Sequence, residues 1–186
     1  MHMLILIERD PPSYDSWPSL IQKKKIPDLS VQEAVSKYQG FEGELVCFFE
    51  VNGNTSEFKK KINECLRVKE LGNCFLLHVL SSPSEMPIFL KDQAIKLGYD
   101  VGACDEEATI YSSIFHEIIF GYFDELVVYK DLLNENLLFP DRSLAEKYVE
   151  THNELSAQGK GVEDYMEMII YEIWKHKGYT AATPKV

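Results

Sequence analysis

The sequence has no long hydrophobic run, no glycine-rich phosphate loop and no excess of positive charge. No apolar stretch in its 186 residues approaches the roughly 18 residues of a membrane-spanning helix, so we expect no contact with a membrane. The glycine patterns that cradle phosphates or dinucleotides are absent. The 19 Lys and Arg residues against 30 Asp and Glu give a formal charge of -11. This balance argues against direct nucleic-acid binding, which needs clustered basic side chains.

Cysteine is scarce and is not arranged in pairs. The four cysteines are Cys47, Cys65, Cys74 and Cys104. None of them forms a CxxC motif, which argues against a zinc ribbon and against a thioredoxin-like site, and we expect buried, reduced thiols. The only early apolar run is Leu4–Ile7, which is too short for the core of a secretory signal. We therefore expect a cytoplasmic protein.

The sequence contains no complete catalytic motif. His116-Glu117 would begin a zinc-protease motif, but Phe120 stands where the second histidine is needed. The other histidines are His2, His78, His152 and His176. They belong to separate predicted elements, so a metal site made from them would need a convergence that the spacing does not predict. We expect no catalytic residue, no metal site and no cofactor, and the hypothesis is a protein that is not an enzyme.

Patterns in the first half predict a sheet with helices packed on it. Apolar and alternating stretches predict strands over 2–8, 44–51 and 74–80. Helical periodicity predicts helices over 55–71 and 82–97. Because a helix joins the second and third strands, we expect a parallel pair in a β-α-β unit.

The second half has the pattern of a mainly helical segment. A long helix is expected over 105–135 and a second over 143–156, with Ser143 as its N-cap. Residues 166–174 fit a strand or a helix, and their β-branched and aromatic content favours the strand. The fold class is therefore predicted to be α+β, with α/β as the alternative. We expect one domain over 1–186, with a small central sheet and a helical C-terminal half.

The negative charge is concentrated in one part of the chain. Residues 1–93 carry a net charge of -2, whereas residues 100–172 carry 17 acidic and four basic residues, a net charge of -13. On a helix over 105–135, five acidic residues would fall within about 40° of one another. They are Glu106, Glu117, Asp124, Asp131 and Glu135. With their neighbours Glu107 and Glu125, these are the predicted partner-binding residues. The plainer alternative is a surface that only keeps the protein soluble.

A set of residues from Leu97 onward resembles the bacterial immunity proteins that are encoded beside secreted polymorphic toxins. The set is Gly98-Tyr99-Asp100, Tyr111-Ser112-Ser113-Ile114, Glu117-Ile118, Gly121, Leu132-Leu133-Asn134-Glu135, Leu138-Phe139, Ala145 and Tyr148. The resemblance covers roughly residues 97–175. It implies a cytoplasmic, non-catalytic protein that binds and blocks one toxin, and it assigns no functional residue.

Three functions remain open at this point. The first is an acidic protein that inhibits a basic partner, such as a toxin domain, by covering its active surface. The second is an α/β enzyme with a site near residues 81–84 and 98–102, where a strand end and an expected turn would meet. The third is an adaptor or structural subunit that forms oligomers. The oligomeric state does not follow from the sequence.

Overall fold

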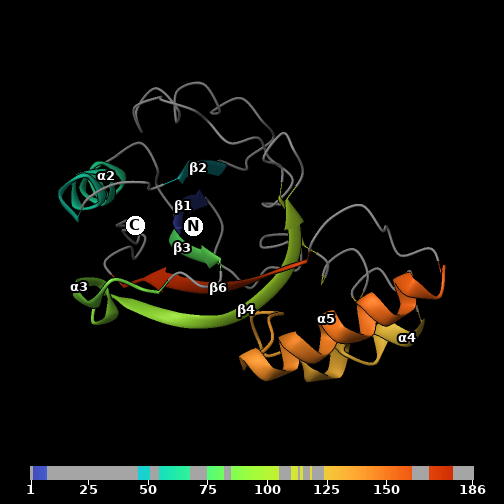
Figure 1. Cartoon of the computed structure of the whole chain (residues 1–186). Coiled ribbons are helices and arrows are strands. Elements are labelled where there is room, and N and C mark those ends of the chain that lie inside the picture. Colours follow the sequence, from blue (N-terminus) through green and yellow to red (C-terminus); the bar gives the residue numbers. More distant parts are fainter. Residues whose placement is uncertain are drawn as a thin grey trace, which may run out of the picture.

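The computed structural model describes residues 2–7, 46–50, 55–67, 75–81, 85–104, 110–112, 114, 118, 124–160 and 168–177. In this part of the chain, one sheet combines with two long helices, α2 (Thr55–Arg67) and α5 (Arg142–Ala157), in an α+β fold (Figure 1). The strands are β1 (His2–Ile7), β2 (Val46–Glu50), β3 (Phe75–Ser81), β4 (Ala94–Cys104), β5 (Ile110–Ser112) and β6 (Ile169–His176). Three short helical elements are α3 (Ile88–Lys91), α4 (Asp124–Val127) and the 3-10 helix η3 (Lys130–Leu132).

The six strands form one sheet in the order β2-β1-β3-β6-β4-β5, and every neighbouring pair is antiparallel. Because β2 and β3 both run antiparallel to β1, they run in the same direction on its two sides. The sequence predicted that the two strands flanking α2 would form a parallel pair. They form no hydrogen bonds with each other, because β1 lies between them and pairs with both.

Strand β6 lies between β3 and β4 near the middle of the sheet, so the described residues 169–174 of the ambiguous segment form a strand. Its residues pair with β3 from Tyr171 to Lys175 and with β4 from Ile169 to His176. Tyr171 and Ile173 are buried. Alternating β-branched and aromatic residues suit such a position, because both edges are hydrogen-bonded and one set of side chains is enclosed.

The helix predicted over 82–97 is wrong. Helix α3 has only four residues, and Pro87 stands at its N-cap with extended backbone angles. The chain turns at Asp92 and enters β4 at Ala94, where pairing with β6 replaces the intrahelical hydrogen bonds. These residues form a strand because they pair with β6, which lies about 80 residues later in the sequence. Local periodicity cannot reveal such a distant partner.

The single helix predicted over 105–135 is also wrong. Strand β4 continues to Cys104, and Ile110–Ser112 pairs with it as β5. Helical residues follow at Ile114 and Ile118, which are π-helical, and in α4 and η3. Three of the six strands lie after residue 93, so the described part of the second half mixes strands and helices. The apolar positions Ile114 and Ile118 are buried, as expected for core residues.

The helix predicted over 143–156 is confirmed as α5, with its start corrected. Asp141, and not Ser143, is the N-cap: its carboxylate accepts a hydrogen bond from the Leu144 backbone N–H at 3.0 Å. The buried positions of α5 are spaced three, four and three residues apart, which places them on one face. They are Ala145, Tyr148, His152 and Leu155.

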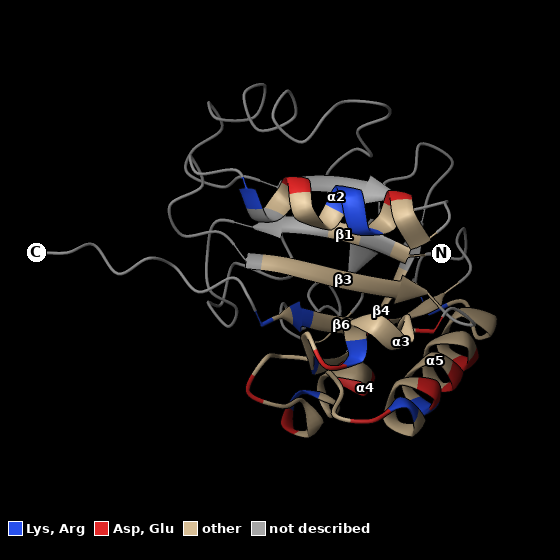
Figure 2. Ribbon diagram, turned by 90° about the vertical axis from the view of Figure 1, so that its left-hand side faces the viewer, with Lys and Arg blue, Asp and Glu red and all other residues tan. Residues whose placement is uncertain are grey.

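The two long helices pack at different ends of the same sheet. Phe58 of α2 contacts the ring of His2 in β1, with 4.5 Å between ring centroids. Helix α5 packs on a cluster that includes Val101 of β4 and Ile170 of β6. Figure 2 shows α2 in front of the β1 side of the sheet and α5 beyond its β4 side. No helix in the described residues is both long enough and apolar enough to span a membrane.

Candidate functional site

The predicted partner-binding residues are placed in part. Asp124 and Glu125 lie in α4, Asp131 lies in η3 and Glu135 follows η3, and all four are exposed. Glu106, Glu107 and Glu117 lie outside the described residues. No single helix joins the set, because β5 interrupts the segment. The line of charge along one helix edge is therefore replaced by acids on several short elements.

These acids belong to a larger surface, which we call the acidic surface: the eight carboxylates of residues 124–160. They are Asp124, Glu125, Asp131, Glu135, Asp141, Glu146, Glu150 and Glu154, and all eight are exposed. Only four basic residues occur in the same range. The acids of α5 face outward because the opposite face of that helix is buried against the sheet.

Few of these carboxylates are neutralised locally. Lys160 lies 2.8 Å from Glu125, and Arg142 lies 2.7 Å from Glu146. The hydrogen bond from Lys160 lowers the pKa of Glu125 below its ordinary value. The other six acids form no ion pair within the described residues: Asp124, Asp131, Glu135, Asp141, Glu150 and Glu154. Of these, Asp141 is engaged as the N-cap of α5.

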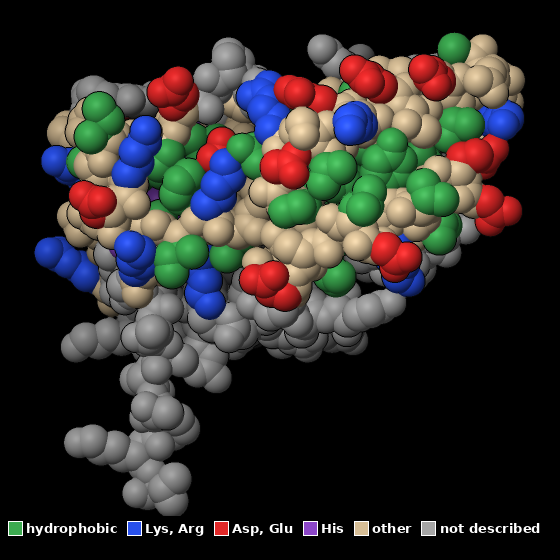
Figure 3. Space-filling view, turned by 90° about the horizontal axis from the view of Figure 1, so that it is seen from below, with side chains coloured by type: hydrophobic (Ala, Val, Ile, Leu, Met, Phe, Trp, Pro, Cys, Tyr) green, Lys and Arg blue, Asp and Glu red, His purple; other side chains and the backbone are tan. Residues whose placement is uncertain are grey.

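Charge is distributed unevenly over the described surface. Figure 2, which colours the ribbon by residue type, shows mostly acidic charged positions on α4 and α5, whereas α2 carries both basic and acidic positions. In Figure 3, which looks at the side of β4, basic side chains gather on the left half and acidic ones around the right half. Most of the hydrophobic side chains on this face lie within the right half, with acidic side chains around them. A partner that approaches this side meets a negative region next to apolar surface, a combination found at protein interfaces.

The regions proposed for an enzyme site have a different structure from the one expected. Ser81 is buried at the end of β3, and residues 82–84 lie outside the described part. Residues 98–102 are not a turn, because they lie within β4. Asp100 is buried there, and its carboxylate accepts a hydrogen bond from the Val101 backbone N–H at 2.8 Å.

A bulge in β4 builds a second site that the sequence did not reveal. Lys96 pairs with Trp174 and Tyr99 pairs with Glu172, so the register shifts by one residue between them, and Leu97 is the extra residue. Without that shift, Lys96 and Tyr99 would point to opposite faces, since they are three positions apart. With it, all four side chains lie on one face of the sheet. We call this group the Lys96 cluster.

The bulge is held by the loop before α5. Gly98 has φ of +148°, a conformation that favours glycine, and a Cβ there would lie 2.8 Å from the carbonyl oxygen of Phe139. The side chain of Asn134 donates a hydrogen bond to the Leu97 carbonyl oxygen at 2.7 Å. Tyr99 and Phe139 exchange two backbone hydrogen bonds of 2.9 Å. The Lys96 cluster is therefore joined to the segment that carries the acidic surface.

The Lys96 cluster surrounds an ammonium group with acceptors and aromatic rings. The Lys96 Nζ atom lies 3.0 Å from a carboxylate oxygen of Glu172 and donates a hydrogen bond to the Tyr99 hydroxyl. It lies 4.1 Å from the centroid of the Tyr99 ring and 5.8 Å from that of Trp174. The indole N–H of Trp174 donates to the same Glu172 oxygen at 2.9 Å, which orients the carboxylate.

The electrostatics of the cluster favour a positive charge. Burial alone would lower the pKa of Lys96, but the hydrogen bonds to Tyr99 and Glu172 and the charge of Glu172 outweigh it and raise the pKa above its ordinary value. The Lys96 side chain is 34% exposed and that of Glu172 is 27% exposed. The site is thus half open to solvent and built to hold an ammonium ion.

Three histidines converge although the sequence did not predict it. His2, His78 and His176 come from the adjacent strands β1, β3 and β6. His2 Nε2 lies 3.3 Å from His78 Nδ1, and His78 Nε2 lies 3.2 Å from His176 Nδ1. We call them the histidine chain. The strand order was the missing information, because residues at the start, middle and end of the sequence become neighbours only once that order is known.

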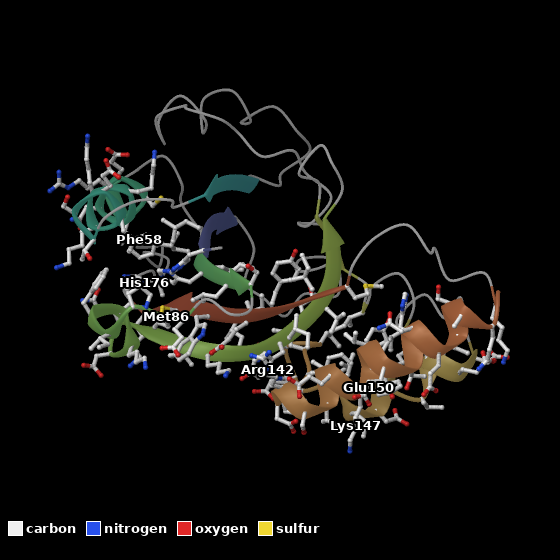
Figure 4. All side chains as sticks on the ribbon, in the orientation of Figure 1. Phe58, Met86, Arg142, Lys147, Glu150 and His176 are labelled. Atoms are coloured by element: carbon white, nitrogen blue, oxygen red, sulfur yellow. The ribbon has the colours of Figure 1, made fainter. Side chains whose placement is uncertain are left out.

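The histidine chain is enclosed and neutral near pH 7. Figure 4 shows His176 beside Phe58 and Met86 at the α2 end of the sheet. Burial lowers the pKa of His2 to about 4 and that of His78 to about 3, and it also lowers the pKa of His176. Each link needs one N–H donor and one bare nitrogen. No group of three or more His, Cys, Asp or Glu side chains within the described residues is arranged to hold a metal ion.

Comparison with known proteins found no match for this chain. No protein-family model matches it, and neither the curated proteins nor the solved structures contain a match. The resemblance to immunity proteins therefore stays an expectation.

Proposed function

We propose that the protein is a non-catalytic binding protein whose acidic surface covers a basic surface of a partner protein. The observation that carries the proposal is the acidic surface itself: eight exposed carboxylates, of which six have no ion-pair partner within the described residues. Unneutralised surface charge of one sign raises the rate of association with a partner of opposite sign and selects against other partners.

The partner class that fits best is a bacterial toxin domain, with this protein as its immunity protein. The resemblance over residues 97–175 motivates this choice. Toxins that act on nucleic acids need basic active surfaces, because they must neutralise phosphates. An acidic protein that occupies the same surface would exclude the substrate. Under this proposal the protein acts in the cytoplasm and does not bind nucleic acid.

The test uses two charge-reversal variants with the same change in net charge. Asp131→Lys/Glu135→Lys alters the acidic surface, and Glu85→Lys/Asp92→Lys alters exposed acids near α3. Each variant is coexpressed with the product of the neighbouring reading frame, which the proposal expects to be a toxin, and cell survival and complex affinity are measured. We expect the first variant to lose protection and at least tenfold in affinity, and the second to retain both.

Salt dependence supplies an independent measurement on the unaltered protein. Exposed charges are screened beyond about 8 Å at physiological ionic strength, so the association rate should fall steeply between low and high salt. The proposal is wrong if the association rate does not change with salt concentration. It is equally wrong if both charge-reversal variants behave alike, or if the protein gives no protection against the neighbouring toxin.

A further inference from the structure

We propose that Tyr99, Glu172 and Trp174 form a binding site for a cationic side chain of the partner, and that Lys96 occupies this site in the free protein. The inference rests on the proposed function, because it assumes a basic partner. It assigns that partner an anchor residue, a lysine or arginine that takes the place of Lys96 when the complex forms.

The first argument is the set of contacts around the ammonium group. A carboxylate at 3.0 Å, the hydroxyl and ring of a tyrosine and the ring of a tryptophan surround the Lys96 Nζ atom. Carboxylates bind cations through charge-assisted hydrogen bonds, and the faces of aromatic rings attract cations within about 6 Å. The same three groups would accept the ammonium or guanidinium group of another chain.

The second argument is that the backbone is shaped to produce this group. The bulge at Leu97 brings Lys96 and Tyr99 to one face, and it depends on the conformation of Gly98 and on the Asn134 side chain. Bulges are frequent next to binding and active sites, where they redirect a side chain. A regular strand would place Tyr99 on the opposite face and leave the ammonium without that ring.

The third argument is the position of the site beside the acidic surface. Tyr99 is bonded through its backbone to Phe139, two residues before Asp141 of the acidic surface. In Figure 3, most of the hydrophobic side chains on this side of the molecule lie in the half that carries the acidic side chains. Trp, Tyr and Arg dominate the energetics of protein interfaces, and neighbouring charges set the approach of the partner.

An internal occupant has a definite effect on affinity. Lys96 is tethered, so it competes with any external cation at an effective concentration that is in the millimolar range for short flexible connections. Small cations therefore bind the unaltered protein weakly. A partner can still displace Lys96 because its other contacts lie on the acidic surface. The lysine stem is long enough for its charged end to move into water.

The experiment removes the internal occupant. Trp17→Phe leaves Trp174 as the single tryptophan, whose fluorescence reports on the site. In that background, Lys96→Met and the matched control Lys175→Met are titrated with tetramethylammonium and with N-acetyl-lysine methylamide. Lys175 pairs with Ile95 and points to the opposite face. We expect Lys96→Met to bind both cations at least tenfold more tightly than the Trp17→Phe protein. Lys175→Met should bind them with the same affinity as the Trp17→Phe protein.

A second variant and a measurement on the unaltered protein guard against misfolding. Adding Glu172→Gln to Lys96→Met should weaken cation binding at least tenfold. In the unaltered protein, tetramethylammonium should shift the Lys96 Cε resonance toward that of a solvated lysine. Equal affinities with and without Lys96 would overturn the inference, as would an unchanged affinity after Glu172→Gln or an unmoved Lys96 resonance.

The outcomes also separate this inference from the proposed function. If charge reversal on the acidic surface abolishes protection but Lys96→Met gains no cation affinity, the proposed function stands and the anchor site is wrong. If Lys96→Met gains cation affinity while charge reversal changes nothing, the cation site stands as a property of the protein, and both the proposed function and the role of a basic anchor in it are wrong.

Discussion

Gly98 and Leu138 approach so closely that a Cβ on Gly98 would lie 2.8 Å from the Cβ of Leu138. Side-chain carbons do not normally come this near to each other, so the loop before α5 fits against β4 only where a glycine stands. The same loop anchors the bulge through Asn134. The position of α5, and with it the acidic surface, thus depends on a contact that only a residue without a side chain permits.

Gly98→Ala should therefore destabilise the protein by about 3 kcal/mol, because it combines an unfavourable φ with overpacking against the loop. Gly159→Ala is the matched control: Gly159 also has a positive φ, of +67°, but nothing lies within 4 Å of its Cβ position. Its cost should be about 1 kcal/mol. Urea unfolding measures both, and equal losses would show that the close approach has no energetic weight.

Stability should fall as the pH drops below the ordinary histidine pKa. The folded protein keeps His78 neutral down to about pH 3, whereas the unfolded chain takes up the proton near pH 6.5. The unfolded state therefore binds more protons in this range, and His78 alone should lower the free energy of unfolding by about 1.4 kcal/mol for each pH unit below 6.5. Stability contributed by the neutral ring is complete above pH 6.5 and is lost progressively below it.

Chemical unfolding between about pH 7.5 and pH 5, with NMR titration of the imidazole signals, tests this expectation. Each link pairs one N–H with one bare nitrogen, so protonation of two of the three rings would place two N–H groups face to face. His78→Gln should be less stable at pH 7.5 and should show a shallower slope. A stability that stays level to pH 5, or a His78 signal that titrates near 6.5, would contradict the enclosed chain.

Asp141, and not Ser143, caps the N-terminus of α5. The Asp141 carboxylate accepts hydrogen bonds from the Leu144 N–H at 3.0 Å and from the Ser143 hydroxyl at 2.7 Å, and these two bonds lower its pKa. Asp141→Ala should lower the melting temperature more than Ser143→Ala, because only the former leaves a helix N–H unsatisfied. Asp141→Asn should stay close to the unaltered protein at pH 7. If Ser143→Ala lowered the melting temperature more than Asp141→Ala, Ser143 would be the N-cap.

Phe139 packs between β4 and α5. Its ring is fully buried and lies 5.5 Å from that of Tyr148 and 6.1 Å from that of Tyr129. Phe139→Ala should cost about 3–5 kcal/mol, since it opens a cavity between β4 and α5 and removes two aromatic contacts. Ile88→Ala, at a side chain that is 85% exposed, should change stability by less than about 0.5 kcal/mol. Thermal unfolding of the two variants checks the contrast.

Local patterns were sufficient where an element's own residues determine it. Strands β1, β2 and β3 and helices α2 and α5 were predicted within a few residues, because alternation, apolar stripes and caps act over short distances. The strand β6 was favoured for the same reason. Cys65 was expected on the buried face of its helix, and it is fully buried.

Prediction failed where the structure depends on distant parts of the chain. Residues 94–97 were predicted to end a helix and residues 98–102 to form a turn, yet residues 94–104 form a strand because they pair with β6. The histidine chain and the Lys96 cluster depend on strand order and on one bulge, and neither leaves a local pattern. The acids at 124, 125, 131 and 135 were correctly expected on the surface, but the regular helix assumed to align them does not exist.

The position of β6 has a consequence for how the protein is made. This strand is the last one in the described chain, yet it lies between β3 and β4 and joins two parts of the sheet that share no other strand. Residues through His176 must leave the ribosome before β6 can pair with β3 and β4. Until then, the edges of β3 and β4 that pair with β6 are unpaired in the nascent chain. Such edges favour association between chains until the final strand enters the gap.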